Sequence, residues 1–218
     1  MLGKQRRQRE QASTRADILV AALALAQEDG WTGVTMRKIA GRIDYTHAAL
    51  YAYFATKDDL FLALFRESTD LLVAALEAAR TTATDPAAAL LAVARAYWDF
   101  AWEHPARYQL LNGLGGVSLA APETIAEGRR AEVVVAGVLD GWTARATPDL
   151  LSLPERVTLL WATLHGLVAL SMAGRLSREQ GERLVAQVAR DALGAWELPP
   201  PASMGEARTD ESRAPDTP

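Results

Sequence analysis

The chain has 218 residues, half of them hydrophobic, and a formal net charge of −4. Alanine and leucine dominate and runs of Val, Ile and Thr are nearly absent, which predicts an all-α protein with a sizeable buried core. The absence of cysteine excludes a disulfide framework and thiolate metal sites, and the basic start lacks the apolar stretch of a secretory signal, so a cytoplasmic location is expected.

Positive charge is concentrated near the N-terminus. Residues 1–50 hold eight Lys or Arg and five Asp or Glu, so this segment is basic while the remainder is acidic. Only nearby charges act strongly, because the Debye length is about 10 Å. A basic head on an acidic body predicts contact with a polyanion, although charged N-termini without any function are also common.

The first sixty residues divide into short helices. Thr14 and Asp17 resemble a capping box, which predicts a helix of about four turns that starts there and ends at Gly30. Two shorter helices are expected at 36–43 and 47–54. The turn of about three residues between them is typical of a helix-turn-helix unit.

The rest of the chain is predicted to form longer helices. Thr56 and Asp59 make a capping box for a helix of about six turns, and prolines and glycines separate those that follow. The expected organisation is a helix-turn-helix DNA-binding domain at 1–56, a larger helical domain at 57–198, and a polar, Pro-rich disordered tail at 199–218. The helices expected in the larger domain after the first are 87–104, 106–113, 122–143, 155–174 and 178–198.

The second short helix carries side chains suited to a DNA major groove. Leu50 and Phe54 would anchor it, Ala48 is small enough to allow close approach, and His47 and Tyr51 offer polar groups to bases or phosphates. The capped helix N-termini add amide donors for phosphate. The residues expected to contact double-stranded DNA are Thr35, Arg37, Tyr45, Thr46, His47, Ala48, Tyr51, Tyr53 and Lys57.

The run "TMRKIAGRIDYTHAALYAYFATKDDL" at residues 35–60 resembles the DNA-binding signature of TetR-type transcriptional regulators. It has the Ile-Ala pair, the Leu-Tyr-x-x-Phe and the Lys-x-x-Leu in the same register. The family usually has Gly-Val-Ser where this chain has Asp44, Tyr45 and Thr46. Thr46 keeps the helix cap and Asp44 tolerates a left-handed turn, whereas Tyr45 is a larger departure that adds a possible DNA contact.

A second stretch, "LLWATLHGLVALSMAG" at residues 159–174, resembles the C-terminal domain of a TetR subgroup with a Trp-x-x-x-His-Gly motif. The resemblance implies a helical ligand-binding and dimerisation domain. No charged residue occurs from Val157 to Gly174, and a helix that is apolar all round is buried on two sides. We therefore expect a two-fold homodimer in which the last helix also takes part. Interface residues are expected at Leu164, Val168, Met172, Leu184 and Val188.

The same stretch reaches the lower length limit of a membrane span. Thr158, Thr163, His165 and Ser171 weaken that alternative, because polar groups are costly in lipid. No membrane partner is expected.

Aromatic residues gather in the middle of the chain. Each is compatible with ordinary core packing, but six tryptophans in a helical domain could together line an apolar cavity for a flat small molecule, with a histidine as its polar group. The residues expected to bind such an effector are Trp98, Trp102, Tyr108, Trp142, Trp161 and His165.

Signals for catalysis are poor. The "GLGG" at 113–116 lacks the strand of a nucleotide loop, and Asp99, Glu103 and His104 are more typical of a solvated helix end than of a metal site. No cofactor and no metal are expected. The leading hypothesis is a homodimeric regulator, a repressor released from a palindromic operator by a small apolar or aromatic effector, and the alternatives are a helical enzyme or carrier and a membrane-associated protein.

Overall fold

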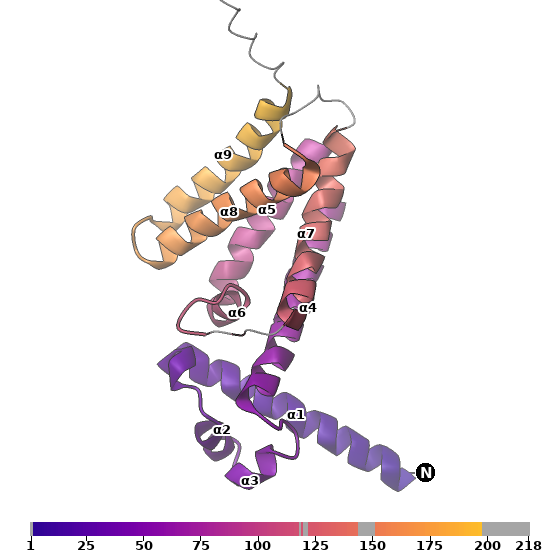
Figure 1. Ribbon diagram of the computed structural model, residues 1–218, viewed down its shortest axis with the longest axis vertical. Helices are drawn as coiled ribbons and strands as arrows, with labels where there is room; N and C mark the ends of the chain where they lie inside the picture. The colour runs from indigo at the N-terminus through magenta and orange to yellow at the C-terminus, as the bar shows by residue number, and fades with distance from the viewer. Residues whose placement is uncertain (1, 118, 120–121, 144–150, 198–218) are drawn as a thin grey trace, which may run out of the picture.

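The structure is a computed structural model that describes residues 2–117, 119, 122–143 and 151–197. Within these ranges the regular elements are nine α-helices and one short 3-10 helix, which confirms the all-α prediction. They form an elongated molecule with a small head at one end and a larger body at the other (Figure 1). No helix in the described part of the chain is long and apolar enough to cross a membrane.

The head consists of α1 (Leu2–Asp29), a 3-10 helix (Trp31–Gly33), α2 (Met36–Arg42), α3 (His47–Leu50) and the first turns of α4 (Lys57–Thr81). Three threonines cap α2, α3 and α4 as predicted. The side-chain oxygens of Thr35, Thr46 and Thr56 each accept a hydrogen bond from the backbone N–H three residues later. These local bonds satisfy amides that a helix leaves free, so the short helices begin at defined residues.

The turn between α2 and α3 follows the sequence expectation. Asp44 has a φ of 57°, the left-handed conformation that Asp tolerates better than most residues. Helix α3 ends at Leu50, earlier than predicted, but the backbone N–H of Phe54 still donates to the Leu50 carbonyl at 3.0 Å. Leu50 and Phe54, which are 0% and 3% exposed, both reach the head core as predicted.

The first helix begins earlier than the sequence suggested. Thr14 lies inside α1 rather than at its N-terminus, is almost buried, and its hydroxyl lies 3.3 Å from that of Tyr45. The residues before it are mostly Gln, Arg and Ala, which have high helix propensity, and Arg6 and Glu10 form an ion pair one turn apart. The capping-box prediction at Thr14 was therefore wrong.

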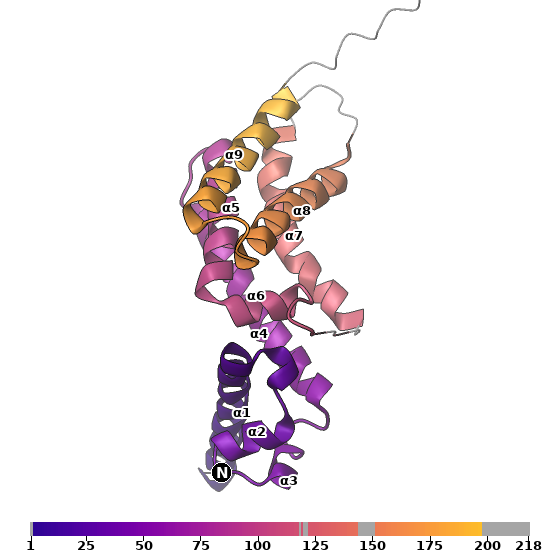
Figure 2. The same ribbon diagram turned by 90° about the vertical axis from the view of Figure 1, so that its left-hand side faces the viewer.

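The body contains the rest of α4 together with α5 (Pro86–Glu103), α6 (Pro105–Leu111), α7 (Pro122–Thr143), α8 (Leu153–Met172) and α9 (Arg178–Glu197). Helix α4 runs from the head into the body (Figures 1 and 2) and contributes side chains to both hydrophobic cores. Its early residues, such as Leu60 and Leu64, pack in the head core, whereas Leu72 and Leu76 pack in the body core. The predicted tail at 199–218 lies outside the described residues.

Helix α6 lies between head and body (Figure 2). Ala106 and Leu110 belong to the head core, and Tyr108 belongs to the body core. The indole N–H of Trp31, in the head, donates to the carbonyl of Ala106 at 3.0 Å. Two turns of helix are therefore shared by both units.

Candidate DNA-binding surface and effector site

The outer side of α3 carries the candidate recognition residues. Leu50 and Phe54 hold this short segment against the head, which leaves Thr46, His47 and Ala48 exposed. Tyr51 is 46% exposed, and its ring packs edge-on against His47 with centroids 5.1 Å apart. The contact limits the freedom of both side chains before any partner binds, so less conformational entropy is lost on binding.

Acidic side chains of α1 partly neutralise the positive charge of α2. Lys38 donates to Asp29 at 2.7 Å, and Nη2 of Arg42 donates to both carboxylate oxygens of Glu28, at 2.6 and 2.7 Å. The bond from Lys38 is the main reason that the pKa of Asp29 is lowered. Arg37 is exposed and forms no ion pair with any described residue, so it is the base of α2 that is available to a polyanion.

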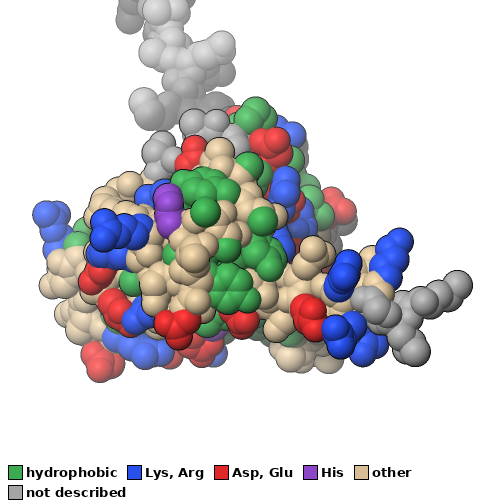
Figure 3. All heavy atoms as spheres, turned by 90° about the horizontal axis from the view of Figure 1, so that it is seen from below, with side chains coloured by type: hydrophobic (Ala, Val, Ile, Leu, Met, Phe, Trp, Pro, Cys, Tyr) green, Lys and Arg blue, Asp and Glu red, His purple; other side chains and the backbone are tan. Residues whose placement is uncertain are grey.

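The other expected DNA contacts differ in exposure. Thr35 is exposed at the start of α2, and Tyr45 is 43% exposed although its hydroxyl also meets Thr14. Tyr53 is half-buried against the head core, and the Lys57 ammonium lies 4.8 Å from the centroid of the Phe61 ring. Seen from below, this end of the molecule presents Lys and Arg together with hydrophobic and His side chains (Figure 3).

A chain of polar side chains crosses the body, buried at Tyr97 and Tyr108 and half-buried at His165. Tyr97 donates to the Tyr108 hydroxyl at 3.2 Å, and the Tyr108 oxygen lies 2.6 Å from Nδ1 of His165. Burial raises the pKa of Tyr97 and raises that of Tyr108 to about 12, and it lowers the pKa of His165. All three groups are therefore neutral at pH 7. The Tyr108 hydroxyl therefore joins the other two groups, since it accepts from Tyr97 and shares a hydrogen bond with Nδ1 of His165.

His165 also lines a cavity of about 180 Å³ between α6, α7 and α8. A second cavity of about 100 Å³ adjoins it and shares Asn112, Glu132 and Trp161 with it. The amide of Asn112 donates to the Tyr108 carbonyl at 2.9 Å, which fixes this side chain at the end of α6. The combined site offers an indole face, a neutral imidazole and a carboxylate to a small molecule.

Two family models match this chain. One, described as bacterial regulatory proteins of the tetR family, matches residues 18–64, and the other, described as a tetracyclin repressor-like C-terminal domain, matches residues 90–195. The chain belongs to the TetR family. Members are transcriptional regulators that bind DNA through a helix-turn-helix domain, so this protein is a DNA-binding regulator and not an enzyme.

Relatives support the assignment. An uncharacterized HTH-type transcriptional regulator of Mycobacterium tuberculosis is 29% identical over 164 residues, which cover 74% of this chain and 71% of the relative. The HTH-type transcriptional activator FasR of Mycolicibacterium smegmatis is 31% identical over 97 residues, which cover 44% of each chain.

Solved structures show the same fold. A protein with unknown function from Rhodococcus sp. RHA1 has a TM-score of 0.74 at 24% identity, and the match covers 84% of this chain and 95% of that one. A TetR family transcription regulator from Marinobacter aquaeolei VT8 has a TM-score of 0.67 at 23% identity, covering 85% and 97% of the two chains.

The TetR body brings together only part of the predicted effector site. Trp161 and His165 line the cavity, and Tyr108 touches it through His165. Trp98 and Trp102 lie elsewhere, against α9: a Cβ on Gly181 would come within 2.0 Å of Trp98, and the Arg178 guanidinium lies 5.3 Å from the Trp102 ring. Neither tryptophan lines the cavity at Trp161, because α5 directs both of them toward α9.

The side chain of Trp142 lies outside the described residues. Asn112 and Glu132 were missed by the sequence reasoning, since neither belongs to a motif and only the tertiary packing of α6 and α7 brings them to Trp161.

The expected dimer residues need correction. Leu164 and Val168 are 4% and 0% exposed within the single chain, since they face the body core, so they are not available to a second copy. Met172 and Val188 are half-buried against the same core, and Leu184 is exposed. The large apolar side chains that α8 leaves exposed are instead Leu159 and Leu170.

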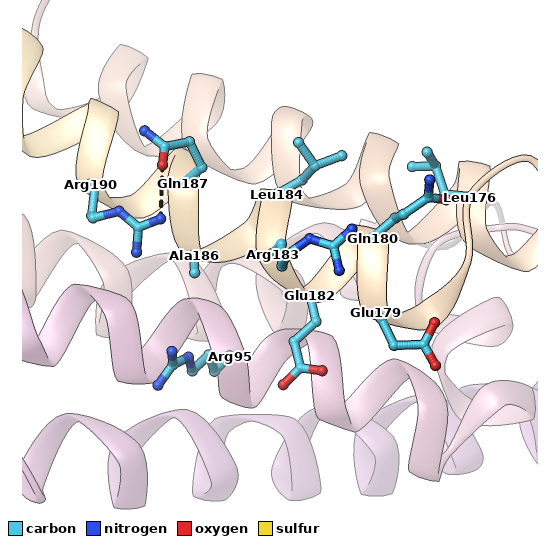
Figure 4. A pocket seen from close by; sticks show the side chains of 10 residues that line it. All are labelled: Arg95, Leu176, Glu179, Gln180, Glu182, Arg183, Leu184, Ala186, Gln187 and Arg190. Carbon is cyan, nitrogen blue, oxygen red and sulfur yellow. Dashed lines mark hydrogen bonds between the residues drawn. The ribbon is translucent and has the colours of Figure 1, made fainter.

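A larger hollow of about 800 Å³ lies between α5 and α9 (Figure 4). Its walls carry both charges, with Arg95 on α5 and Glu182, Arg183 and Arg190 on α9. Such walls do not match an apolar effector, because the charged groups would lose hydration without gaining partners. The smaller cavity at Trp161 is the better candidate in this regulator, because Glu132 is the one charged side chain in its described lining.

Proposed function

We propose that the protein is a homodimeric repressor that leaves a near-palindromic operator when a small aromatic or apolar effector binds its body. The observation that carries the proposal is the exposed set Thr46, His47 and Tyr51, which is held on the head by two buried anchors. Such a regulator acts on chromosomal DNA, and the cytoplasm is therefore its proposed location.

In DNA binding, α3 enters the major groove and the polar groups around it hold phosphates. Ala48 permits close approach, and His47 and Tyr51 meet base edges or phosphates. Thr35, Arg37, Tyr45 and the amides at the start of α2 and α3 contact the backbone, while Tyr53 and Lys57 contribute at the rim. Two heads on a two-fold axis read half-sites about 34 Å apart.

The dimer forms through α8 and α9. Leu159 and Leu170 on α8 and Leu184 on α9 are 57%, 40% and 41% exposed, although large apolar side chains are usually covered. A two-fold axis lets the same patch meet itself, so one surface provides both halves of the interface.

This interface can be tested by charge insertion. Leu184→Glu is expected to shift the protein from dimer to monomer in sedimentation velocity. Leu71→Glu is the matched control, because Leu71 is 39% exposed on α4. A Leu184→Glu protein that stays dimeric contradicts the proposed interface.

The effector occupies the cavity lined by Trp161 and His165, and its signal reaches the head through α6. Tyr108 on α6 contacts His165, while Ala106 on the same short helix accepts the bond from Trp31 in the head. A ligand that displaces Tyr108 therefore acts on a helix packed in both cores. It shifts DNA affinity by as much as it prefers the displaced arrangement.

DNase I footprinting on the region upstream of the protein's own gene tests the proposed function. We expect a protected, roughly palindromic site that is lost in His47→Ala. His104→Ala removes the same side chain from the body and should leave the footprint unchanged. Absence of any sequence-specific protection on DNA flanking the gene would refute the proposal. Transcript levels in a deletion strain then give the sign of regulation, which matters because the relative FasR is an activator.

A further inference from the structure

The N-terminal turns of α1 form a basic extension beyond the head. Helix α1 starts at Leu2, and the residues from Lys4 to Ser13 are all exposed, whereas Thr14, Ile18, Ala22 and Leu25 are buried in the head. In Figure 1 the N-terminal end of α1 projects from the end of the molecule that carries α3. In Figure 3, Lys and Arg side chains gather on this projecting arm.

One face of α1 continues from the head core into this extension. The buried positions are spaced by three or four residues, and the same spacing continues through Gln11 to Arg7 and Lys4. Residues with this spacing lie on one face of a helix. The face that packs on the head is therefore apolar up to Thr14 and basic beyond it.

The position of this face relative to α3 follows from a direct contact. The Thr14 hydroxyl lies 3.3 Å from that of Tyr45, which directly precedes the α3 cap at Thr46. The basic part of the face thus starts beside the N-terminus of α3. Lys4 and Arg7 form no salt bridge or side-chain hydrogen bond with any described residue, whereas Arg6, on a different face, pairs with Glu10.

We propose that Lys4 and Arg7 bind phosphates of the DNA that flanks the sequence read by α3. This inference rests on the proposed DNA binding and extends its footprint. From Thr14 to Lys4 the helix advances about 15 Å, at about 1.5 Å per residue. That reach corresponds to about four base pairs of duplex at about 3.4 Å each. The contact carries no sequence information, because phosphates are the same at every base pair.

Salt dependence measures these contacts directly. Each phosphate contact contributes about 0.9 to the slope of log K against log salt. Lys4→Gln/Arg7→Gln removes four cations from a dimer and should lower the slope by up to about 3.6, with affinity at physiological salt reduced roughly tenfold or more. Gln keeps a helix propensity close to those of Lys and Arg, and circular dichroism checks that the helix remains.

The matched control removes the same number of positive charges from the same turns of α1, but from its other faces. Arg6→Gln/Arg9→Gln should leave the slope near the wild-type value. We also expect the wild type to lose affinity when the duplex is trimmed by about four base pairs on each side, and Lys4→Gln/Arg7→Gln to lose little, since the reach is about 15 Å. The preference for operator over scrambled sequence should persist in both variants.

Fluorescence anisotropy with the full chain on long and trimmed duplexes measures the DNA affinity and its salt dependence for the wild type and both double variants. Equal changes in slope for both double variants, or a Lys4→Gln/Arg7→Gln slope equal to that of the wild type, would overturn the inference while leaving the proposed function intact. Failure of the wild type to bind any flanking DNA would overturn both.

Discussion

The hydroxyl of Tyr108 joins two other polar groups in the body, so Tyr108→Phe should destabilise the protein. Tyr97 and Tyr108 are 1% and 0% exposed, and the Tyr108 oxygen is 3.2 Å from the Tyr97 hydroxyl and 2.6 Å from Nδ1 of His165. Removing that oxygen leaves the Tyr97 hydroxyl without an acceptor where water does not reach. His165 is half-exposed, so water can replace its lost partner.

The expected cost is set mainly by Tyr97. A buried polar group without a partner costs about 1–3 kcal/mol, and we expect a loss of about 2 kcal/mol in the free energy of unfolding. For a chain of this length, that corresponds to a fall in Tm of roughly 4–8 °C. Urea unfolding followed by circular dichroism, at one fixed protein concentration because a dimer's stability depends on it, measures the change.

A double variant tests the reasoning more sharply. Tyr97→Phe/Tyr108→Phe removes both hydroxyls, so no phenol is left buried without a partner, and the double variant should be more stable than Tyr108→Phe alone. Tyr51→Phe, which changes an exposed phenol on α3, should leave stability unchanged. A Tyr108→Phe protein within about 0.5 kcal/mol of the wild type would refute the argument, since the smallest expected penalty is about 1 kcal/mol.

Two further perturbations probe the body. Gly181→Ala should lower the free energy of unfolding by about 1–3 kcal/mol in the same urea assay, because the added Cβ would come within 2.0 Å of Trp98 and α5 and α9 must separate. An unchanged urea midpoint would contradict this close packing. Burial lowers the pKa of His165, so the unfolded chain binds more protons than the folded one, and stability should fall as pH drops below about 6.5. His165→Gln should reduce that slope in unfolding measurements between about pH 7 and 5, and a slope equal to the wild type's would show that other groups cause it.

The sequence predicts the head well because its signals are local. Thr35, Thr46 and Thr56 cap helices through hydrogen bonds from residues three positions later. The local sequence pattern is therefore enough to predict where these helices begin. The start of α1 was missed because the deciding contact is not local. Thr14 is a residue type that often caps helices, but its hydroxyl contacts that of Tyr45, 31 residues away, and no local pattern reveals this contact.

The body is less predictable because its faces are decided by tertiary packing. Helix α8 is apolar on nearly all sides, so periodicity alone does not separate Leu164, which faces the core, from Leu159, which faces outward. The tryptophans show the same limit. Trp98 and Trp161 are both apolar and aromatic, and only the positions of α6, α7 and α9 send one to Gly181 and the other to the cavity.

Two helices, α4 and α6, contribute side chains to both cores. Helix α4 is long and packs along its length in both units, so moving it as a whole would disturb many contacts at once. Helix α6 has seven residues and is tied to the head by the Trp31 bond and to the cavity by Tyr108. We expect a small shift of α6 to change few contacts and yet to alter both proposed sites. For this reason we expect an effector to act on the head through α6 first, with α4 following as the rigid connection.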